Sequence, residues 1–217
     1  MQIIGITGGI GSGKSTIARA LAARGYAVYD CDKEAKRIIA ENEEVQQKII
    51  ELLGEEAFVE VPSNQEPSTK VYNTAYVASR VFANPELLER LNQIVHPAVK
   101  KDILQHPLLR RGRGERFFIE SAILYEAGLD ELCDRIIVVE APEEVRIART
   151  IQRDYRGEAT EENIDKVRAR IQAQKTVCHQ PGQTCISPQR VVHNDGKVSI
   201  EDLVSEILQE LQRCAKP

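Results

Sequence analysis

The sequence contains no long apolar stretch. None of its 217 residues lies in a run that approaches the roughly 18 apolar residues of a membrane-spanning helix, so we expect no contact with a membrane. The apolar run at the N-terminus is only about five residues long before glycine interrupts it, which is too short for the hydrophobic region of a secretory signal peptide. We therefore expect a cytoplasmic protein.

Cysteines are few and irregularly spaced. The five are Cys31, Cys133, Cys178, Cys185 and Cys214. An odd number without a regular pattern argues against a disulfide framework and favours reduced thiols. Cys178, His179 and Cys185 could form a metal site, but they lack the paired C-x-x-C spacing that is typical of zinc ligands. We favour the interpretation that they are loop residues.

An excess of positive charge is also missing. The formal net charge is −4, whereas a protein that coats nucleic acid usually carries the opposite sign. Residues 110–116 (RRGRGER) form a short basic segment, but it lacks interleaved aromatic residues and precedes an apolar run, where solvated turns are common. We expect no nucleic-acid partner.

Short apolar runs alternate with helical patterns along much of the chain. The predicted buried strands are Gln2–Thr7, Ala27–Asp30, Phe117–Glu120, Arg135–Glu140 and Arg190–His193. Helical patterns run from Ser15 to about Gly25, in a long helix that begins near Pro142, and in an amphipathic segment from Ile200 to Leu211. Helices between successive strands favour a parallel five-stranded sheet in a doubly wound α/β fold.

The middle of the chain has a different pattern. From Lys33 to about His106 the apolar periodicity is almost entirely helical, with breaks at Gly54, at residues 62–68, at Pro85 and at Pro97. We interpret residues 33–106 as a helical insertion between strands of the sheet. The predicted core then comprises residues 1–32, 107–150 and 188–217.

The strongest motif lies at the N-terminus. Gly8–Ser15 (GGIGSGKS) matches G-x-x-x-x-G-K-[ST], with a predicted strand before it and a predicted helix after it. Glycines let the loop bend so that backbone N–H groups converge on phosphate oxygens, and the positive end of the following helix faces the same anion. Lys14 would supply charge to the β- and γ-phosphates, and the Ser15 hydroxyl would bind Mg²⁺. A glycine-rich turn without a ligand is the alternative.

A P-loop alone does not distinguish a kinase from a GTPase or a motor ATPase. The chain has no N-K-x-D motif, which a GTPase would use to recognise guanine. Motor ATPases usually have an Asp-Glu pair after a later apolar strand, whereas here a single acid, Glu120, is followed by Ser121. The helical insertion and the arginine-rich helix near Arg149 favour a P-loop kinase of the nucleoside-monophosphate-kinase type.

Two aspartates end the second predicted strand. Ligands of such sheets bind outside the carboxyl ends of the strands, so Asp30 and Asp32 should lie near the P-loop. A carboxylate there could deprotonate an attacking hydroxyl or hold Mg²⁺ through water. Asp32 could equally be the N-cap of a helix that starts at Lys33. The local pattern leaves both interpretations open.

Several motifs together resemble those of dephospho-CoA kinases. They are T-G-G-I-G-S-G-K-S-T at Thr7–Thr16, D-x-D at Asp30–Asp32, R-V-F-A-N-P-E at Arg80–Glu86, Leu91-Asn92, His96-Pro97, the helix with Arg146, Arg149 and Arg153-Asp154, Gln174, and Asn194-x-Gly196. These motifs cover most of the chain. The P-loop is common to many families, but the D-x-D, F-A-N-P-E and H-P set in this order is far more specific.

The resemblance implies a fold and an activity. The fold would be a P-loop NTPase-type three-layer sheet with an acceptor-binding insertion and a lid at residues 151–187. The activity would be Mg²⁺-dependent transfer of the ATP γ-phosphate to the ribose 3′-hydroxyl of dephospho-CoA, giving coenzyme A and ADP in the last step of coenzyme A synthesis. The partners would be these two small molecules, and the protein would be a monomer or a weak homo-oligomer.

The resemblance also implies roles for particular residues. Asp32 would be the general base, and Arg149 a lid arginine that approaches the transferred phosphoryl group. The ATP phosphates would be bound by Gly11, Ser12, Gly13, Lys14, Ser15 and Thr16. Phe82, Asn92 and His96 would contact the acceptor. The alternatives are that Phe82 is only a core residue and that His96-Pro97 is only a helix break.

The arginines before the lid also allow two interpretations. Arg146, Arg149 and Arg153 are spaced by three and four residues, so they can share one helix face. That face is either a solvated charged surface or a stripe that contacts phosphate, for which the forked guanidinium is suited. Two other functions also remain open: a kinase for another small acceptor, such as a nucleoside monophosphate, and a nucleotide-gated switch.

Overall fold

The computed structural model describes most of the chain. The described residues are 1–61, 69–82, 84–110, 116–174 and 190–213. They fall into two compact units, Met1–Asp30 with Leu108–Pro217 and Cys31–Pro107, each of which is considered by itself. Within the described ranges, no helix combines the length and the apolar character needed to cross a membrane.

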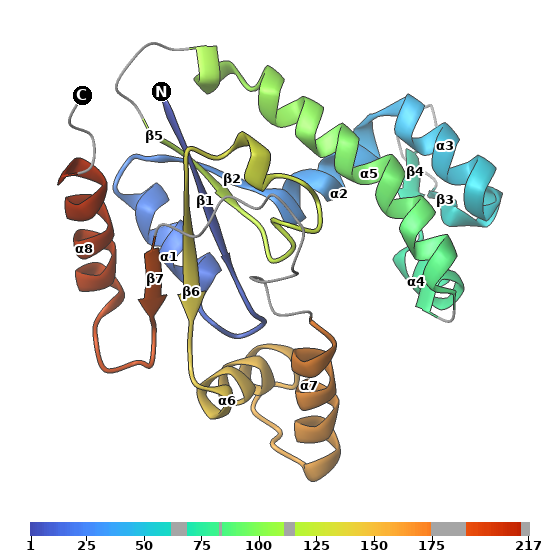
Figure 1. The fold of residues 1–217 in the computed structure, drawn as a ribbon. Coiled ribbons are helices and arrows are strands. Elements are labelled where there is room, and N and C mark those ends of the chain that lie inside the picture. Colours follow the sequence, from blue (N-terminus) through green and yellow to red (C-terminus); the bar gives the residue numbers. More distant parts are fainter. Residues whose placement is uncertain (62–68, 83, 111–115, 175–189, 214–217) are drawn as a thin grey trace. The chain divides into compact units, whose positions relative to one another are not determined.

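A five-stranded parallel sheet forms the first unit, in the order β2-β5-β1-β6-β7 (Figure 1). Its strands are β1 (Gln2–Gly8), β2 (Ala27–Asp30), β5 (Arg116–Glu120), β6 (Arg135–Glu140) and β7 (Arg190–His193). The predicted α/β sheet is therefore confirmed, with each strand within one residue of its expected bounds. A short 3₁₀ turn, Asp130–Leu132, lies between β5 and β6.

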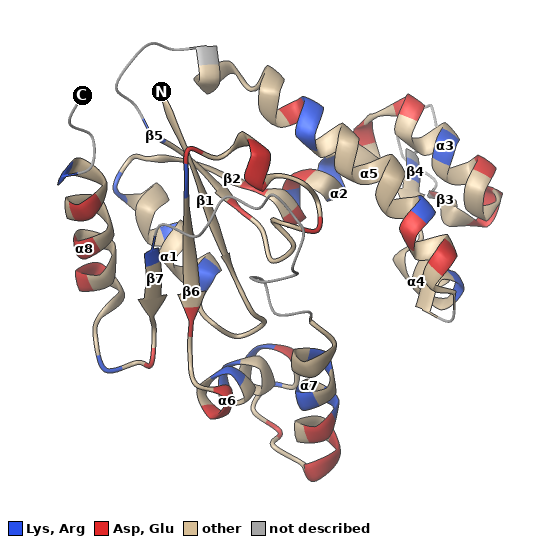
Figure 2. Ribbon diagram, in the orientation of Figure 1, with Lys and Arg blue, Asp and Glu red and all other residues tan. Residues whose placement is uncertain are grey.

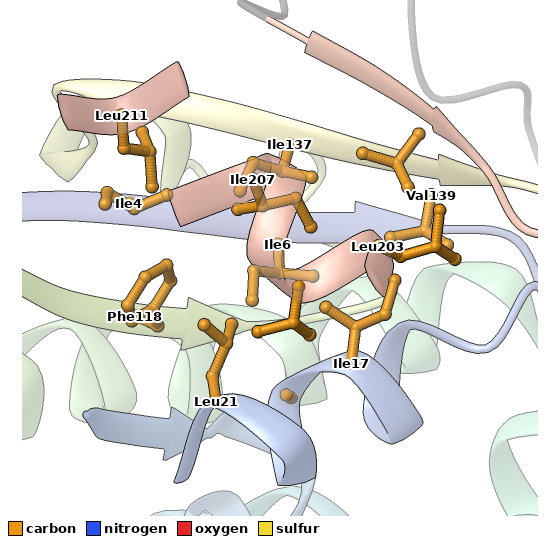
Figure 3. Close-up of a cluster of buried hydrophobic side chains, with 13 residues drawn as sticks. Ile4, Ile6, Ile17, Leu21, Phe118, Ile137, Val139, Leu203, Ile207 and Leu211 are labelled. Atoms are coloured by element: carbon orange, nitrogen blue, oxygen red, sulfur yellow. The ribbon is translucent and has the colours of Figure 1, made fainter. Parts of the chain in front are cut away.

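Two helices cover one face of this sheet, α1 (Lys14–Ala23) and α8 (Ile200–Arg213) (Figure 3). Alternate strand residues such as Ile4 and Ile6 point to this face, because side chains alternate along a strand. They pack against helix residues at 3.6-residue spacing, including Ile17 and Leu203. Each such side chain stabilises the fold by about 1.5–3 kcal/mol on burial.

The register brings the functional segments to one edge of the sheet. Asp30 and Ile6 both pair with Glu120, which ends β5. Gly8, the last residue of β1, pairs with Val139 near the end of β6. Because all five strands are parallel, the segments that follow them leave from the same edge. These are the P-loop after β1 and the turns after β2, β5, β6 and β7.

The segment between β6 and β7 contains two described helices, α6 (Glu143–Asp154) and α7 (Glu161–Ala173). The predicted helix that begins near Pro142 is confirmed as α6, whereas α7 was not predicted. The chain turns at Arg156 (φ 52°) and Gly157 (φ 88°), and Thr160 caps α7 by accepting a hydrogen bond from the Asn163 N–H. Because α7 has a narrow apolar stripe among many charges, its periodicity is weak in sequence (Figure 2). That stripe packs with α6 and the P-loop residue Ile10.

The second unit is mainly helical. Its helices are α2 (Cys31–Glu41), α3 (Glu43–Leu53), α4 (Thr74–Phe82) and α5 (Pro85–Gln105), with a 3₁₀ turn at Glu55–Ala57, and a second 3₁₀ turn, Pro107–Arg110, begins where this unit ends. It also contains an antiparallel hairpin, β3 (Phe58–Val61) with β4 (Thr69–Tyr72), which contradicts the almost entirely helical prediction. Phe58 pairs across it with Tyr72, with ring centroids 5.5 Å apart. Strands of four residues are too short to reveal a period in sequence.

Helix α5 also departs from the prediction. It runs through Pro97 without ending, so the predicted break at this position was wrong. Proline removes one backbone hydrogen bond inside a helix and usually bends or ends it. Here Leu91, Val99 and Ile103 are buried on both sides of the proline, and their packing outweighs that local loss.

Candidate active site

The P-loop follows a path that requires glycine at two positions. Gly11 (φ 76°) and Gly13 (φ 95°) both adopt left-handed backbone conformations. A Cβ atom on Gly11 would lie 2.4 Å from the Arg146 carbonyl oxygen, and one on Gly13 would lie 2.1 Å from Nδ2 of Asn194. Gly13 is the N-cap of α1 and has no side chain to cap it, so the first N–H groups of this helix can face an anion.

A buried carboxylate lies beside the two polar residues that follow Gly13. Ser15 Oγ donates a hydrogen bond to Glu120 Oε1 over 3.1 Å, and Lys14 Nζ lies 3.8 Å from the same oxygen. The side chains of Glu120 and Lys14 are only 5% and 13% exposed. A positive charge, a hydroxyl and a carboxylate therefore converge at the sheet edge, where they can bind phosphate and a hard cation.

Helix α6 holds the first half of the loop through Arg146. Arg146 Nε donates to the Ile10 carbonyl oxygen over 2.8 Å, and its guanidinium leaves no room for a Cβ on Gly9. Burial lowers the pKa of Arg146, although the Glu143 carboxylate acts in the opposite direction. Arg146 was predicted as part of an arginine stripe, but its support of a P-loop carbonyl was not predicted.

Arg149 and Asn194 hold the second half of the loop. Arg149 Nη1 donates to the Ser12 and Asn194 carbonyl oxygens over 3.3 and 3.0 Å, and Nη2 donates to Asn194 Oδ1 over 3.2 Å. Arg153 instead pairs with the adjacent Asp154 and is largely exposed. Arg146 and Arg149 therefore contact the P-loop, and Arg153 belongs to a solvated ion pair.

Gln174, at the end of α7, bridges two loops of the site. Its Oε1 accepts a hydrogen bond from the Ile10 N–H over 2.7 Å, and its Nε2 donates to the Ala122 carbonyl oxygen over 3.3 Å. The α6–α7 pair thus contacts the P-loop through hydrogen bonds and through the packing of Ile10. A position that is remote in sequence fixes the backbone of the phosphate-binding motif.

The two aspartates after β2 lie in different units. Asp30 ends the strand next to Glu120, and Asp32 is the second residue of α2. Since α2 begins at Cys31, Asp32 is not the residue that precedes the helix, and the alternative interpretation of Asp32 as an N-cap was wrong. Asp32 is an exposed acid in the first turn, where a negative charge interacts favourably with the helix dipole.

The predicted acceptor residues lie on α4 and α5. Phe82 ends α4 and is 94% exposed, so the alternative that it fills a core was wrong. Asn92 and His96 are one turn apart on α5 and are both half-buried. Burial lowers the pKa of His96, so its imidazole is neutral at neutral pH.

Metal ligands from protein side chains are sparse in the part of the chain that the structure describes. There, no group of three or more His, Cys, Asp or Glu residues is close enough to hold an ion. Cys178, His179 and Cys185 lie outside the described residues, as does most of the basic segment 110–116. Cys31 and Cys133 are buried, and burial raises the pKa of the Cys133 thiol to about 12.

The predicted and observed sites overlap only in part. The structure brings Lys14, Ser15 and Arg149 to the same sheet edge, as the motif and the family landmarks suggested. Sequence reasoning assigned no role to Glu120 or Asn194. Two signals were available: each residue ends or directly follows a strand on the edge that carries the P-loop, and Asn194 belongs to the Asn194-x-Gly196 motif that resembles the family.

Comparison with known proteins gives consistent matches over nearly the whole chain. The family model for dephospho-CoA kinases matches residues 2–199. A dephospho-CoA kinase of Chlorobaculum tepidum is 35% identical over 212 residues, which cover 97% of this chain and 93% of the relative. One from Porphyromonas gingivalis is 38% identical over 154 residues, 71% of each chain.

Solved structures agree with the fold. A Thermus thermophilus protein superposes with a TM-score of 0.69 at 29% identity, covering 100% of this chain and 98% of that one. Dephospho-CoA kinase from Campylobacter jejuni (TM-score 0.60, 20% identity, 100% of both chains) and shikimate kinase from Acinetobacter baumannii (0.52, 15%, 100% and 96%) share the P-loop kinase fold. With a family match over residues 2–199 and full-length relatives above 30% identity, this chain belongs to the dephospho-CoA kinase family.

Proposed function

We propose that this protein transfers the γ-phosphate of ATP to the ribose 3′-hydroxyl of dephospho-CoA, giving coenzyme A and ADP. The observation that carries this proposal is the placement of Lys14 and Ser15 beside the buried carboxylate of Glu120, in a chain of the dephospho-CoA kinase family. That arrangement binds a nucleoside triphosphate, and the family supplies the acceptor.

The donor side uses the P-loop and its supports. The phosphates of ATP would lie against the backbone of Gly11 to Thr16, at the N-terminus of α1. Lys14 would offset charge on the β- and γ-phosphates, and Arg149 would use its remaining N–H groups on the transferring phosphoryl group. Because these groups are already held by protein contacts, they need little rearrangement during the reaction.

The residues present also fit Mg²⁺. Ser15 Oγ and the Glu120 carboxylate are hard oxygen donors on one side of the P-loop, and Mg²⁺ in kinases typically has one or two such protein ligands besides water and phosphate oxygens. When bound, Mg²⁺ would neutralise charge that develops on the phosphate oxygens. Ser15 would be the direct ligand, and Glu120 would orient the ion or its water.

Asp32 is the proposed general base. It is exposed, lies two residues beyond the strand end at Asp30, and carries no basic partner among the described contacts. The 3′-oxygen of the acceptor would attack the γ-phosphorus in line while the bond to the β–γ bridging oxygen breaks. The hydroxyl proton would pass to Asp32, and ADP would leave with the bonding electrons, so no phosphoenzyme forms.

The remaining assignments concern the acceptor and the lid. Residues 33–106 would bind dephospho-CoA, with contacts from Phe82, Asn92 and His96. The exposed ring of Phe82 supports this, because an aromatic face in solvent can stack on an adenine. Residues 151–187 would act as a lid that excludes water and limits ATP hydrolysis.

An acceptor panel tests the proposal. ADP release from MgATP would be measured with dephospho-CoA, AMP, shikimate or no acceptor, with Lys14→Met as the inactive control. We expect only dephospho-CoA to give fast release, with one added phosphate on its ribose by mass spectrometry. Stimulation by AMP instead would identify a nucleoside-monophosphate kinase. Nucleotide binding without any acceptor-stimulated turnover would favour a nucleotide-gated switch.

A further inference from the structure

The carbonyl of Ser12, in the P-loop, accepts hydrogen bonds from two side chains. The Ser12 oxygen accepts a hydrogen bond from Asn194 Nδ2 over 2.9 Å and a second from Arg149 Nη1 over 3.3 Å. A carbonyl has two acceptor sites, so these two donors satisfy it. This carbonyl therefore has a fixed direction within the loop.

The direction of that carbonyl also fixes the next N–H group. A trans peptide is planar, and its C=O and N–H point in opposite directions. Since the Ser12 carbonyl points at Asn194 and Arg149, the N–H of Gly13 must point away from them. Gly13 is the N-cap of α1, and the N–H groups at the N-terminus of a helix can bind an anion. The contact to Ser12 thus presents a backbone donor for phosphate.

Asn194 is itself firmly held. Its side chain is almost fully buried, with the residue only 2% exposed, and its backbone N–H donates to the Glu140 carbonyl oxygen over 2.7 Å. Its amide nitrogen occupies the space where any residue other than glycine at position 13 would place a Cβ. Its Oδ1 accepts from Arg149 Nη2, so a single amide group contacts both the P-loop and the arginine.

We propose that Asn194 is a positioning residue for phosphoryl transfer. Its side chain orients the Gly13 N–H toward the nucleotide phosphates and orients Arg149 toward the transferring phosphoryl group. The Arg149 half of this inference rests on the proposed function, whereas the Gly13 half needs only that the P-loop binds a nucleotide. The two roles use opposite ends of the amide, Nδ2 for the loop and Oδ1 for the arginine.

Two substitutions separate these roles. Asn194→Ala removes both contacts. Asn194→Asp keeps an acceptor for Arg149 but faces the Ser12 carbonyl with an oxygen instead of a donor. MgATP affinity is measured by calorimetry without any acceptor, so the result does not depend on whether dephospho-CoA is the substrate. We expect both variants to bind MgATP about 10- to 100-fold more weakly, because a buried carbonyl loses a partner.

Turnover and stability distinguish positioning from a structural role. With saturating MgATP and dephospho-CoA, kcat of Asn194→Ala should fall about tenfold further than kcat of Asn194→Asp, which still orients Arg149. Asn42→Asp, at the N-cap of α3, is the matched control for an added carboxylate and should leave MgATP affinity unchanged. If Asn194→Asp fails to fold, the MgATP affinity of Asn194→Ala alone tests whether Asn194 orients the P-loop. A lower Tm with MgATP affinity and kcat at the wild-type values would overturn the proposal.

Discussion

The P-loop and the Cys31–Pro107 unit show opposite kinds of preparation for chemistry. At the P-loop, the carbonyls of Ile10 and Ser12 and the Ile10 N–H are each held by a side chain from a remote part of the sequence. In the second unit, Phe82 is 94% exposed and Asp32 lies in solvent on the first turn of α2. Hydrogen bonds from side chains already hold the backbone of the donor site, whereas the proposed acceptor residues Phe82 and Asp32 are exposed to solvent.

The two parts of the site therefore differ in how far their contacts specify a role. A bonded loop shows where charge and N–H groups point, so its role follows from geometry. An exposed residue shows only that it is accessible, and its role depends on the family resemblance. Substitutions at the two sites should therefore differ in kind: those at the P-loop should alter nucleotide chemistry, and those in the second unit should alter acceptor turnover alone.

Lys14→Met should have the largest effect. The Lys14 side chain is only 13% exposed, which is less than expected for a residue on an open loop. Methionine is chosen because it keeps the packing of the aliphatic part of the lysine side chain. Loss of the positive charge beside the phosphates should lower kcat by on the order of a thousandfold or more. Thermal unfolding should show a folded protein. A kcat near that of the wild type would remove Lys14 from the mechanism.

Asp32→Asn tests the acceptor side of the comparison. If Asp32 removes the hydroxyl proton, kcat should drop by roughly 10²–10⁴. MgATP affinity should not change, because the donor site is bonded independently of this residue. Glu43→Gln is the matched control, since it removes an acid from the first turn of α3 in the same way. Equal, small effects of both substitutions would reduce Asp32 to a helix-dipole partner.

Glu120→Gln tests the carboxylate on the donor side. The amide keeps the size of the side chain but removes the charge next to Lys14 and Ser15. We expect kcat to fall about 10- to 100-fold and the Mg²⁺ concentration for half-maximal activity to rise. Glu140→Gln, at the end of β6 on the same edge, serves as the control because its side chain is 56% exposed. An unchanged Mg²⁺ titration would contradict a role for Glu120 in metal binding.

The sequence predicted those features that are encoded in a contiguous segment. The P-loop, the strands and the amphipathic α8 each have a local pattern, and the structure contains all of them. Glu120 contacts Ser15, 105 residues away, and Asn194 contacts Ser12, 182 residues away, and Arg149, 45 residues away, so the neighbouring residues in the sequence do not predict these contacts. The hairpin and the continuous α5 were missed because tertiary packing outweighs short-range signals such as Pro97.

Phe82→Ala should have a smaller effect, confined to the acceptor. A ring that is 94% exposed contributes little to the core, so Tm should stay within about 1 °C of the wild type. Loss of stacking should raise KM for dephospho-CoA about tenfold, with KM for ATP unchanged. Leu104→Ala, a 54% exposed position on α5, is the matched control. If both substitutions leave KM for dephospho-CoA unchanged, Phe82 does not contact the acceptor.

Asp154→Asn should have the smallest effect and concern stability alone. Asp154 joins α6 to α7, since it accepts hydrogen bonds from Arg153 over 2.6 Å and from Arg170 over 2.8 Å. These guanidinium groups lower the pKa of Asp154 from 3.8 to about 2, chiefly through the hydrogen bond from Arg153. Because the pair is solvated and screened, its charge contributes only about 1 kcal/mol at pH 7.

The stabilisation by the Asp154 carboxylate depends on pH. The folded-state pKa lies below the unfolded value, so the stabilisation is complete above about pH 4 and is lost as the pH falls through about 2. The Tm difference between the wild type and Asp154→Asn should therefore be constant from pH 5 to 8 and shrink toward pH 2.

Glu162→Gln, which breaks the solvated pair with Lys166, is the control and should not change Tm. MgATP affinity should be unchanged in both variants, because the side chains that hold the P-loop are those of Arg146, Arg149, Gln174 and Asn194 and not those of this surface ion pair. A large loss of affinity in Asp154→Asn would instead show that the Asp154 ion pair also helps to shape the donor site.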